Sequence, residues 1–211
     1  MELLPDKINT YIEDHTTAES EVLKALNRET HIKVQMPQML SGHVQGQVLR
    51  MISMMIKPQN ILEIGTFTGY SAICMAAGLQ QNGKLVTLDI NDELEEMVRK
   101  YFTQAGLEEK IDYRLGNALD IIPQLDMRFD LVFIDADKQN YSRYYDLVFD
   151  KVNSGGFILA DNVLWSGKVI EENPNKDTKA LIDFNTKVQA DERVENVLFP
   201  VRDGIMVVRK K

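Results

Sequence analysis

The stretch FDLVFIDADKQNYSRYYDLVFDKVNSGGFILADN, residues 129–162, decides the fold of this chain. Its apolar runs FDLVFI and FILA are rich in β-branched and aromatic residues, which is typical of strands buried on both faces. The segment NYSRYYDLVFDKV between them predicts a helix. A strand, a helix and a second strand joined by short loops form a parallel pair with a right-handed crossover. The stretch therefore predicts a parallel sheet covered by helices.

The same alternation extends in both directions. Residues 60–79, 84–106 and 111–125 each predict a strand followed by a helical segment. Residues 194–211 predict two more strands joined at residues 202–204, which we expect to form an antiparallel hairpin. The predicted fold class is α/β: a Rossmann-like, doubly wound sheet, mostly parallel, with a C-terminal antiparallel hairpin.

The N-terminal part predicts helices. Residues 6–30 carry apolar residues at helical spacing, which indicates one or two amphipathic helices. Residues 41–55 predict another helix, which ends before Pro58. We expect its apolar stripe to contain Val44, Val48, Leu49, Ile52 and Met55.

Length and composition limit the architecture and the partners. The 211 residues fit a single domain, with a helical cover over residues 1–56 and a sheet core over residues 57–211. The formal net charge of -8 disfavours nucleic acid unless basic residues cluster locally. No apolar run matches a membrane span or a signal peptide, so we expect a cytoplasmic protein without a membrane partner. Cys74, in SAICMAAGL, is predicted to pack in the core.

Oxygen ligands follow the two strands of the opening stretch. Asp135 ends the first strand, and Asp161 and Asn162 end the second. The carboxyl ends of parallel strands open on one edge, about 4.8 Å apart for neighbours, so these side chains can reach one ion. An all-oxygen set favours a hard cation such as Mg²⁺, Mn²⁺ or Ca²⁺. Asp137 is a second candidate ligand, but we favour Asp135 because it directly continues the strand.

Two further side chains are expected near this ion. Lys138, three residues beyond Asp135, adds an amine at the same edge. Trp165 begins the polar loop WSGKVIEENPNKDTKA and is predicted to pack against the ring of a substrate. The alternatives are a solvated connector for the loop and an exposed salt bridge for Lys138.

The turn ILEIGTFTGYSA is typical of a nucleotide-type site. Gly65 and Gly69 are separated by three residues, including an aromatic one, so the turn departs from the G-x-G-x-x-G pattern that binds NAD. Backbone N–H groups at the helix start suit a carboxylate, and Glu63 suits a cationic amine. Asp89, at the end of the second strand, is placed to accept hydrogen bonds from ribose hydroxyls. Ala118, after the third strand, leaves room for a flat base.

Together these motifs resemble the cation-dependent class I O-methyltransferases, which use S-adenosylmethionine and include catechol and caffeoyl-CoA O-methyltransferases; the bacterial branch is the most similar. LEIGTFTGYS, FIDADKQNY, LADNVLWSG and the terminal DGI carry the resemblance. It implies that the three oxygen ligands hold the metal, that Lys138 is the catalytic lysine and that Ser166 lies near the acceptor. It also implies a cofactor pocket lined by Ser41, Glu63, Gly65, Thr66, Ser71, Asp89, Ala118 and Asp137.

The expected reaction is divalent-metal-dependent transfer of a methyl group from S-adenosylmethionine to a hydroxyl of a small catechol-like or phenolic acceptor. Two adjacent acceptor oxygens would bind the ion, and Lys138 would take the proton. His15, His31 and His43 are alternative bases, although none is tied to the sheet edge. The resemblance and the methionine-rich segments also predict a homodimer.

Three alternatives differ in acceptor or class. The first is methylation of a hydroxylated uridine in tRNA, which a basic strip would dock. The second is a nicotinamide-dependent dehydrogenase, and the third is a binding module without catalysis. The predicted basic strip comprises Lys33, Lys168, Lys176, Lys179, Arg209, Lys210 and Lys211.

Overall fold

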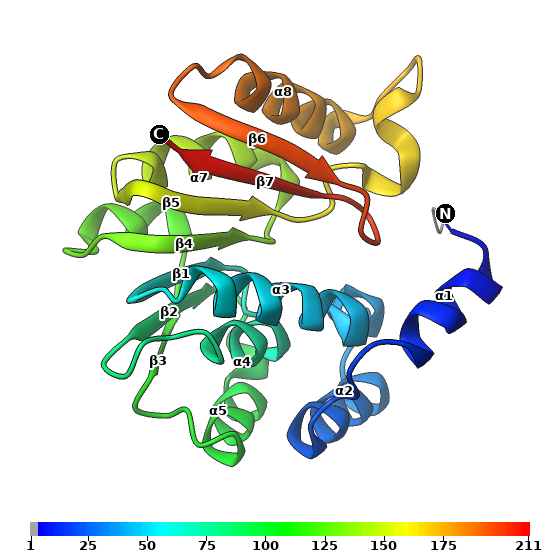
Figure 1. Cartoon of the computed structure of the whole chain (residues 1–211), viewed down its shortest axis with the longest axis vertical. Coiled ribbons are helices and arrows are strands. Elements are labelled where there is room, and N and C mark those ends of the chain that lie inside the picture. Colours follow the sequence, from blue (N-terminus) through cyan, green and yellow to red (C-terminus); the bar gives the residue numbers. More distant parts are fainter. Residues whose placement is uncertain (1–3) are drawn as a thin grey trace.

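Seven strands form one sheet in the computed structural model, which describes residues 4–211. Their order is β3-β2-β1-β4-β5-β7-β6, and β1 to β5 are parallel, whereas β7 runs antiparallel to both β5 and β6 (Figure 1). The predicted mostly parallel sheet with an antiparallel C-terminal hairpin is therefore confirmed. The strands are β1 (Asn60–Ile64), β2 (Lys84–Asp89), β3 (Ile111–Leu115), β4 (Phe129–Ile134), β5 (Val152–Ala160), β6 (Val194–Phe199) and β7 (Ile205–Lys210).

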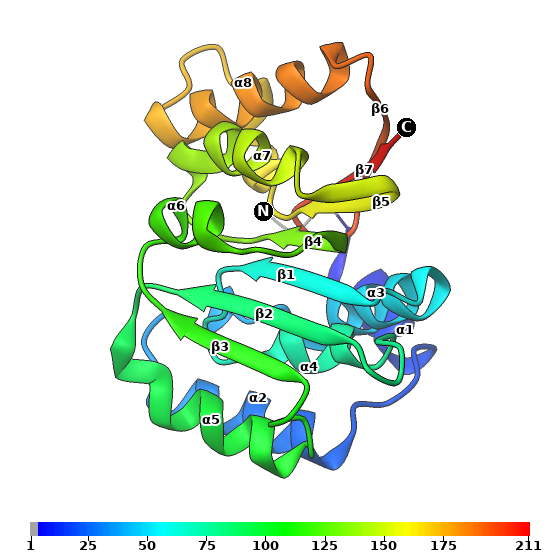
Figure 2. The ribbon, with the colours of Figure 1, turned by 90° about the vertical axis from the view of Figure 1, so that its left-hand side faces the viewer.

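Alternate side chains of each strand enter two separate cores, as the two-residue period of a strand requires. Ile61 and Leu131 face one core, whereas Leu62 and Val132 face the other. Helices α2 (Glu21–Lys33), α3 (Gly42–Ile56), α4 (Tyr70–Ala76) and α5 (Glu95–Gln104) cover the first. Helices α7 (Tyr141–Phe149) and α8 (Lys176–Ala190), with the short α6 (Ala118–Ile121), cover the second (Figure 2). Because both faces are covered, the central strands can be apolar throughout.

The N-terminal segment forms two helices before α3, as predicted. They are α1 (Asp6–Asp14) and α2, whose Ser20 side chain accepts a hydrogen bond from the Leu23 N–H and so caps the helix. Residues 1–3 of the predicted helical cover lie outside the described residues. Every helix found among residues 4–211 is too short or too polar to cross a bilayer.

The predicted apolar stripe of α3 is partly wrong. Leu49 is buried, but Met55 is 72% exposed. The other buried residues of the helix are Gln45, Gly46 and Ser53, which an apolar pattern does not reveal. Ser53 donates to the Met75 carbonyl at 2.6 Å, so a polar contact rather than an apolar one fixes this end of α3. Cys74, by contrast, is buried as predicted.

Candidate functional site

The carboxyl ends of β1, β2, β4 and β5 open into one cavity of about 2130 Å³. Sheets of this kind bind ligands at that edge, where the strand order reverses beside β1. Ligand pockets usually occupy roughly 300–1,000 Å³, so this cavity has room for a nucleoside-type donor together with a second molecule.

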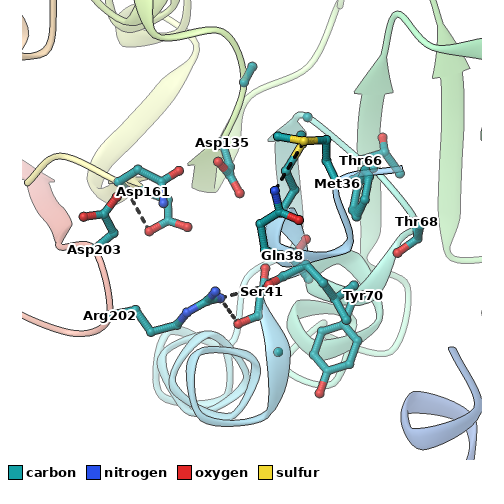
Figure 3. A pocket seen from close by; sticks show the side chains of 18 of the residues that line it. Met36, Gln38, Ser41, Thr66, Thr68, Tyr70, Asp135, Asp161, Arg202 and Asp203 are labelled. Carbon is teal, nitrogen blue, oxygen red and sulfur yellow. Dashed lines mark hydrogen bonds between the residues drawn. The ribbon is translucent and has the colours of Figure 1, made fainter. Parts of the chain in front are cut away.

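The predicted oxygen ligands converge at this edge. Ile134 and Ala160 are partners in the ladder between β4 and β5, so Asp135 and Asp161 leave the sheet side by side. Figure 3 shows both carboxylates facing the same space. The Lys138 ammonium joins the group, donating to Asn162 Oδ1 at 2.8 Å and to Asp135 Oδ1 at 3.2 Å. The Lys138 side chain thus contacts two of the three predicted metal ligands.

The Lys138 side chain is held from several directions. It is only 9% exposed, which does not fit an exposed salt bridge. Its Nζ donates to Tyr141 Oη at 2.6 Å and lies 5.6 Å from the centre of the Trp165 ring. These contacts hold the amine at the cavity wall.

Tyr141 is a residue that the sequence analysis missed. It is fully buried, and burial raises the pKa of its phenol well above the ordinary value, with the Asp135 and Asp161 charges adding to the effect. The hydroxyl therefore keeps its proton and donates it to the Asp161 carbonyl at 2.9 Å. Its lone pair then accepts the bond from Lys138. Its place three residues after Lys138 in a predicted helix was the only sequence signal.

Asp161 is the more enclosed of the two carboxylates, with 2% of its surface exposed. Its Oδ1 accepts the Asn162 N–H at 2.7 Å, and its Oδ2 accepts Gln45 Nε2 at 2.5 Å. Burial raises the pKa of Asp161, and the neighbouring Asp135 raises it further. A bound cation would oppose both effects and favour the ionised form.

Asp137 differs from Asp135 in its partners. Tyr144 Oη donates to Asp137 Oδ1 at 2.5 Å, and Asn140 Nδ2 donates to Oδ2 at 2.6 Å. Both Asp137 oxygens thus accept hydrogen bonds from side chains at the start of α7, whereas Asp135 contacts Lys138. This arrangement favours Asp135 as the ligand.

The donor set fits a hard cation. It contains two carboxylates and one amide oxygen, all of the type that Mg²⁺, Mn²⁺ and Ca²⁺ prefer. Among residues 4–211 there is no group of three or more His, Cys, Asp or Glu side chains placed to hold a metal.

The glycine turn packs directly against the sheet edge that carries Asp135. Gly65 has φ +101°, and a Cβ there would lie 1.9 Å from the Asp135 carbonyl oxygen. Only glycine fits this conformation and this approach. Thr66 and Ser71 line the cavity behind it.

Glu63 lies beneath the turn and does not line the cavity. It is fully buried, and Thr87 Oγ1 donates to its Oε2 at 2.5 Å, while the Thr66 and Thr87 hydroxyls are 2.6 Å apart. Its Oε1 is buried without a hydrogen-bond partner. Burial raises the pKa of Glu63 to about 8, against the opposing effects of the nearby Ser71 and Thr87 hydroxyls. An orphaned buried oxygen of this kind fits a ligand that supplies a cationic donor.

The other predicted cofactor residues border the same cavity. Asp89 accepts the Phe67 N–H at 2.7 Å and the Asn91 N–H at 2.9 Å, so each of its oxygens keeps a lone pair for a ligand. Ser41 and Ala118 also line the cavity.

The loop predicted to lie near the acceptor is strained. Asn162, Trp165 and Ser166 have φ values of +58°, +48° and +54°, a region that non-glycine residues rarely adopt. Asp203, in the turn between β6 and β7, accepts the Ser166 N–H with its side chain and the Leu164 N–H with its carbonyl. Such strain persists only where neighbours hold it, and it gathers at functional sites.

The histidines contact the N-terminal helices. His15, His31 and His43 each bond a backbone carbonyl, of Tyr11, Asn27 and Thr17 respectively. Among the described residues, none of these imidazoles bonds the oxygen cluster.

The predicted basic strip is not one surface, and that prediction is wrong. Arg209 pairs with Phe157 in the ladder and Met206 with Ala160, so the C-terminus lies at the end of β5 opposite the site. Lys211 Nζ donates to the Glu192 carbonyl there. The tail therefore cannot continue a strip with lysines near the cavity.

Comparison with known proteins identifies the family. Residues 13–211 match the model of a family described as O-methyltransferase. This chain belongs to that family. Caffeoyl-CoA O-methyltransferase 1 of Eucalyptus globulus is 37% identical over 205 residues, covering 91% of this chain and 82% of the relative. The predicted resemblance and the prediction of an enzyme are both confirmed.

Two solved structures of methyltransferases share the fold. The methyltransferase PaMTH1 of Podospora anserina, solved with S-adenosylhomocysteine (SAH), is 27% identical with a TM-score of 0.91, covering 99% of this chain and 98% of that one. The O-methyltransferase of Bacillus cereus, also in complex with SAH, is 29% identical with a TM-score of 0.88, covering 97% of each chain. Membership of the family sets aside the dehydrogenase and the non-catalytic module.

Proposed function

We propose that this protein transfers a methyl group from S-adenosylmethionine to a hydroxyl of a small acceptor with two adjacent oxygens, in a reaction that needs a divalent cation. The observation that carries the proposal is the convergence of Asp135, Asp161, Asn162 and the Lys138 amine on one cavity that also contains the Gly65 turn. A catechol or a related phenol offers two such oxygens.

The donor would occupy the side of the cavity bordered by Gly65, Ser71 and Asp89. Asp89 would accept the ribose hydroxyls, and the unpaired oxygen of Glu63 would attract the donor's amine past Ser71. Ala118 leaves space for the base. In related proteins the product SAH occupies the fold, which supports the same class of donor here.

The cation would be held by Asp135, Asp161 and Asn162, where it would lower the pKa of the acceptor hydroxyl and fix its direction. Lys138, as the neutral amine, takes the proton from that hydroxyl and becomes the ammonium. The acceptor oxygen then bonds the methyl carbon as the carbon–sulfur bond breaks, and SAH is the product. Trp165 packs on the acceptor ring, and Ser166 lies near it.

An assay with isotopically labelled S-adenosylmethionine and Mg²⁺ tests this function against two panels, small catechols and total tRNA. We expect label in the catechols, and its loss when a chelator removes the cation. Lys138→Met should lower turnover about 10²- to 10⁴-fold. The matched control is Lys168→Met, because Lys168 is exposed and does not line the cavity. Label in tRNA alone would show that the acceptor is wrong.

We also propose a homodimer. Met51, Met54 and Met55 of α3 are 56%, 43% and 72% exposed, and three neighbouring methionines on one helix are an unusual free surface. Light scattering should give about twice the chain mass of 24.1 kDa. A mass equal to one chain at all concentrations would refute the dimer.

A further inference from the structure

A chain of hydrogen bonds connects the turn between β6 and β7 to the cation site through helix α3. Arg202 Nη1 donates to the carbonyls of Leu40 and Ser41, and to Gln45 Oε1 at 3.4 Å. Gln45 Nε2 donates to Asp161 Oδ2 at 2.5 Å. Figure 3 shows Arg202 extending from its turn toward Ser41 at the start of the helix. The chain joins segments that are far apart in the sequence.

The two ends of the Gln45 amide have partners of opposite kind. The side chain is completely buried, so an amide without partners would be unfavourable there. With the NH₂ toward Asp161 and the oxygen toward Arg202, both ends are satisfied. A flipped amide would place oxygen against carboxylate and NH₂ against guanidinium. Asp161 and Arg202 together therefore fix which way the Gln45 amide points.

We propose that Gln45 is a positioning residue for the metal ligand Asp161, and that Arg202 acts on the same ligand through Gln45. This inference rests on the cation site of the proposed function. Gln45 and the Asn162 N–H hold one oxygen each of the Asp161 carboxylate, so its plane is fixed while each oxygen keeps a lone pair for the ion. Side chains that hydrogen-bond to a metal ligand commonly affect the affinity of the site for the metal.

The position of Gln45 on α3 connects this role to the donor. Ser41 precedes the helix by one residue and lines the cavity, and its carbonyl is held by the same Arg202 nitrogen. The first turn of α3 thus borders the side of the cavity proposed for the methyl donor, and it also carries the amide that orients Asp161. Gln45 itself does not line the cavity, so it acts on Asp161 from outside it.

Binding of Mn²⁺ to the full chain tests the proposal, with the free ion measured by electron paramagnetic resonance. We expect Gln45→Met, which keeps the length of the side chain and removes both hydrogen bonds, to weaken Mn²⁺ binding about 10- to 100-fold. In turnover, the KM for Mg²⁺ should rise by a similar factor while kcat at saturating Mg²⁺ is largely kept. The matched control is Gln47→Met on the same helix, whose amide bonds the Thr17 carbonyl.

Arg202→Met tests the second step of the chain. It should weaken Mn²⁺ binding less than Gln45→Met does, and the double variant should bind as Gln45→Met alone, because one residue acts through the other. Additive losses would overturn the role of Arg202. If Gln45→Met does not fold, a loss of affinity in Arg202→Met still supports the chain, and unchanged affinity overturns it.

The outcomes separate this inference from the proposed function. If the original chain binds Mn²⁺ and Gln45→Met binds it equally or more tightly, the role of Gln45 is overturned. The proposed cation site is then unaffected. Absence of Mn²⁺ binding in the original chain overturns both. A loss common to the Gln45 and Gln47 variants would show a general effect on α3 and would also overturn the proposal.

Discussion

Replacing Glu63 with glutamine tests whether the acid beneath the glycine turn is protonated in the folded protein. The carboxyl is fully buried, and its pKa is raised to about 8 from an ordinary value of 4.5. Glutamine has nearly the same shape and stays neutral at every pH. The variant therefore removes the titration and leaves the packing.

The sign and size of the effect follow from linkage. Between pH 4.5 and 8 the folded chain holds a proton on Glu63 that the unfolded chain has lost, so stability falls as the pH rises. The loss is about 1.4 kcal/mol per pH unit, or about 4 kcal/mol between about pH 5 and about pH 8. The neutral amide of the variant contributes no such loss, so Glu63→Gln should become the more stable protein by about that amount at the higher pH.

Urea unfolding at a series of pH values measures the difference. Trp165 is the single tryptophan, and its fluorescence gives one signal for both proteins. Glu172→Gln, in an exposed loop, controls for the removal of one negative charge. Saturating SAH should reduce the gap, because the ligand's amine stabilises the ionised carboxylate. A stability difference that stays within about 1 kcal/mol across the range would refute a protonated Glu63.

Three further predictions concern the turn, the N-terminal helices and Tyr141, the partner of Lys138. Gly65→Ala should destabilise the fold by about 3 kcal/mol or more, measured by thermal unfolding, because its Cβ would meet the Asp135 carbonyl and its φ is positive. Glu29→Gln should cost about 1 kcal/mol at neutral pH, since charged partners lower the pKa of Glu29 to about 2. That difference should disappear in acid urea titrations as the pH falls from 4.5 toward 2, and a constant difference would contradict it. Tyr141→Phe removes an acceptor 2.6 Å from Lys138 and should lower kcat about 10-fold, with unchanged kcat as the contrary result.

The sequence predicted those parts of the site that depend on strand ends. Asp135 and Asp161 follow apolar runs, and neighbouring parallel strands must bring them to one edge. Gly65 was identifiable because a turn from strand to helix needs it. The choice between Asp135 and Asp137 was harder. It depends on the bonds that Asn140 and Tyr144 make at the start of α7, where side-chain directions decide.

Contacts across the fold could not be predicted. Gln45 and Asp161 are separated by 116 positions, and nothing local marks either as the other's partner. In α3 the apolar period placed Met55 in the core, where the structure instead buries Gln45 and Ser53. Periodicity assigns buried positions to apolar residues. It therefore fails where buried hydrogen bonds determine the packing.

Contacts between adjacent strands and contacts across the fold support different parts of the site. Gly65 lies against the Asp135 backbone between adjacent strands, so the donor turn and the cation edge cannot move independently. The proposed acceptor wall is held instead by hydrogen bonds to the turn between β6 and β7. Its Trp165–Ser166 loop is strained and depends on Asp203 in a turn beyond β6. We therefore expect changes in that turn to alter the proposed acceptor wall more than the proposed sites of the methyl donor and the ion. For this reason we expect acceptor choice to depend on Trp165 and the turn at Arg202 and Asp203, and the chemistry to depend on β1, β4 and β5.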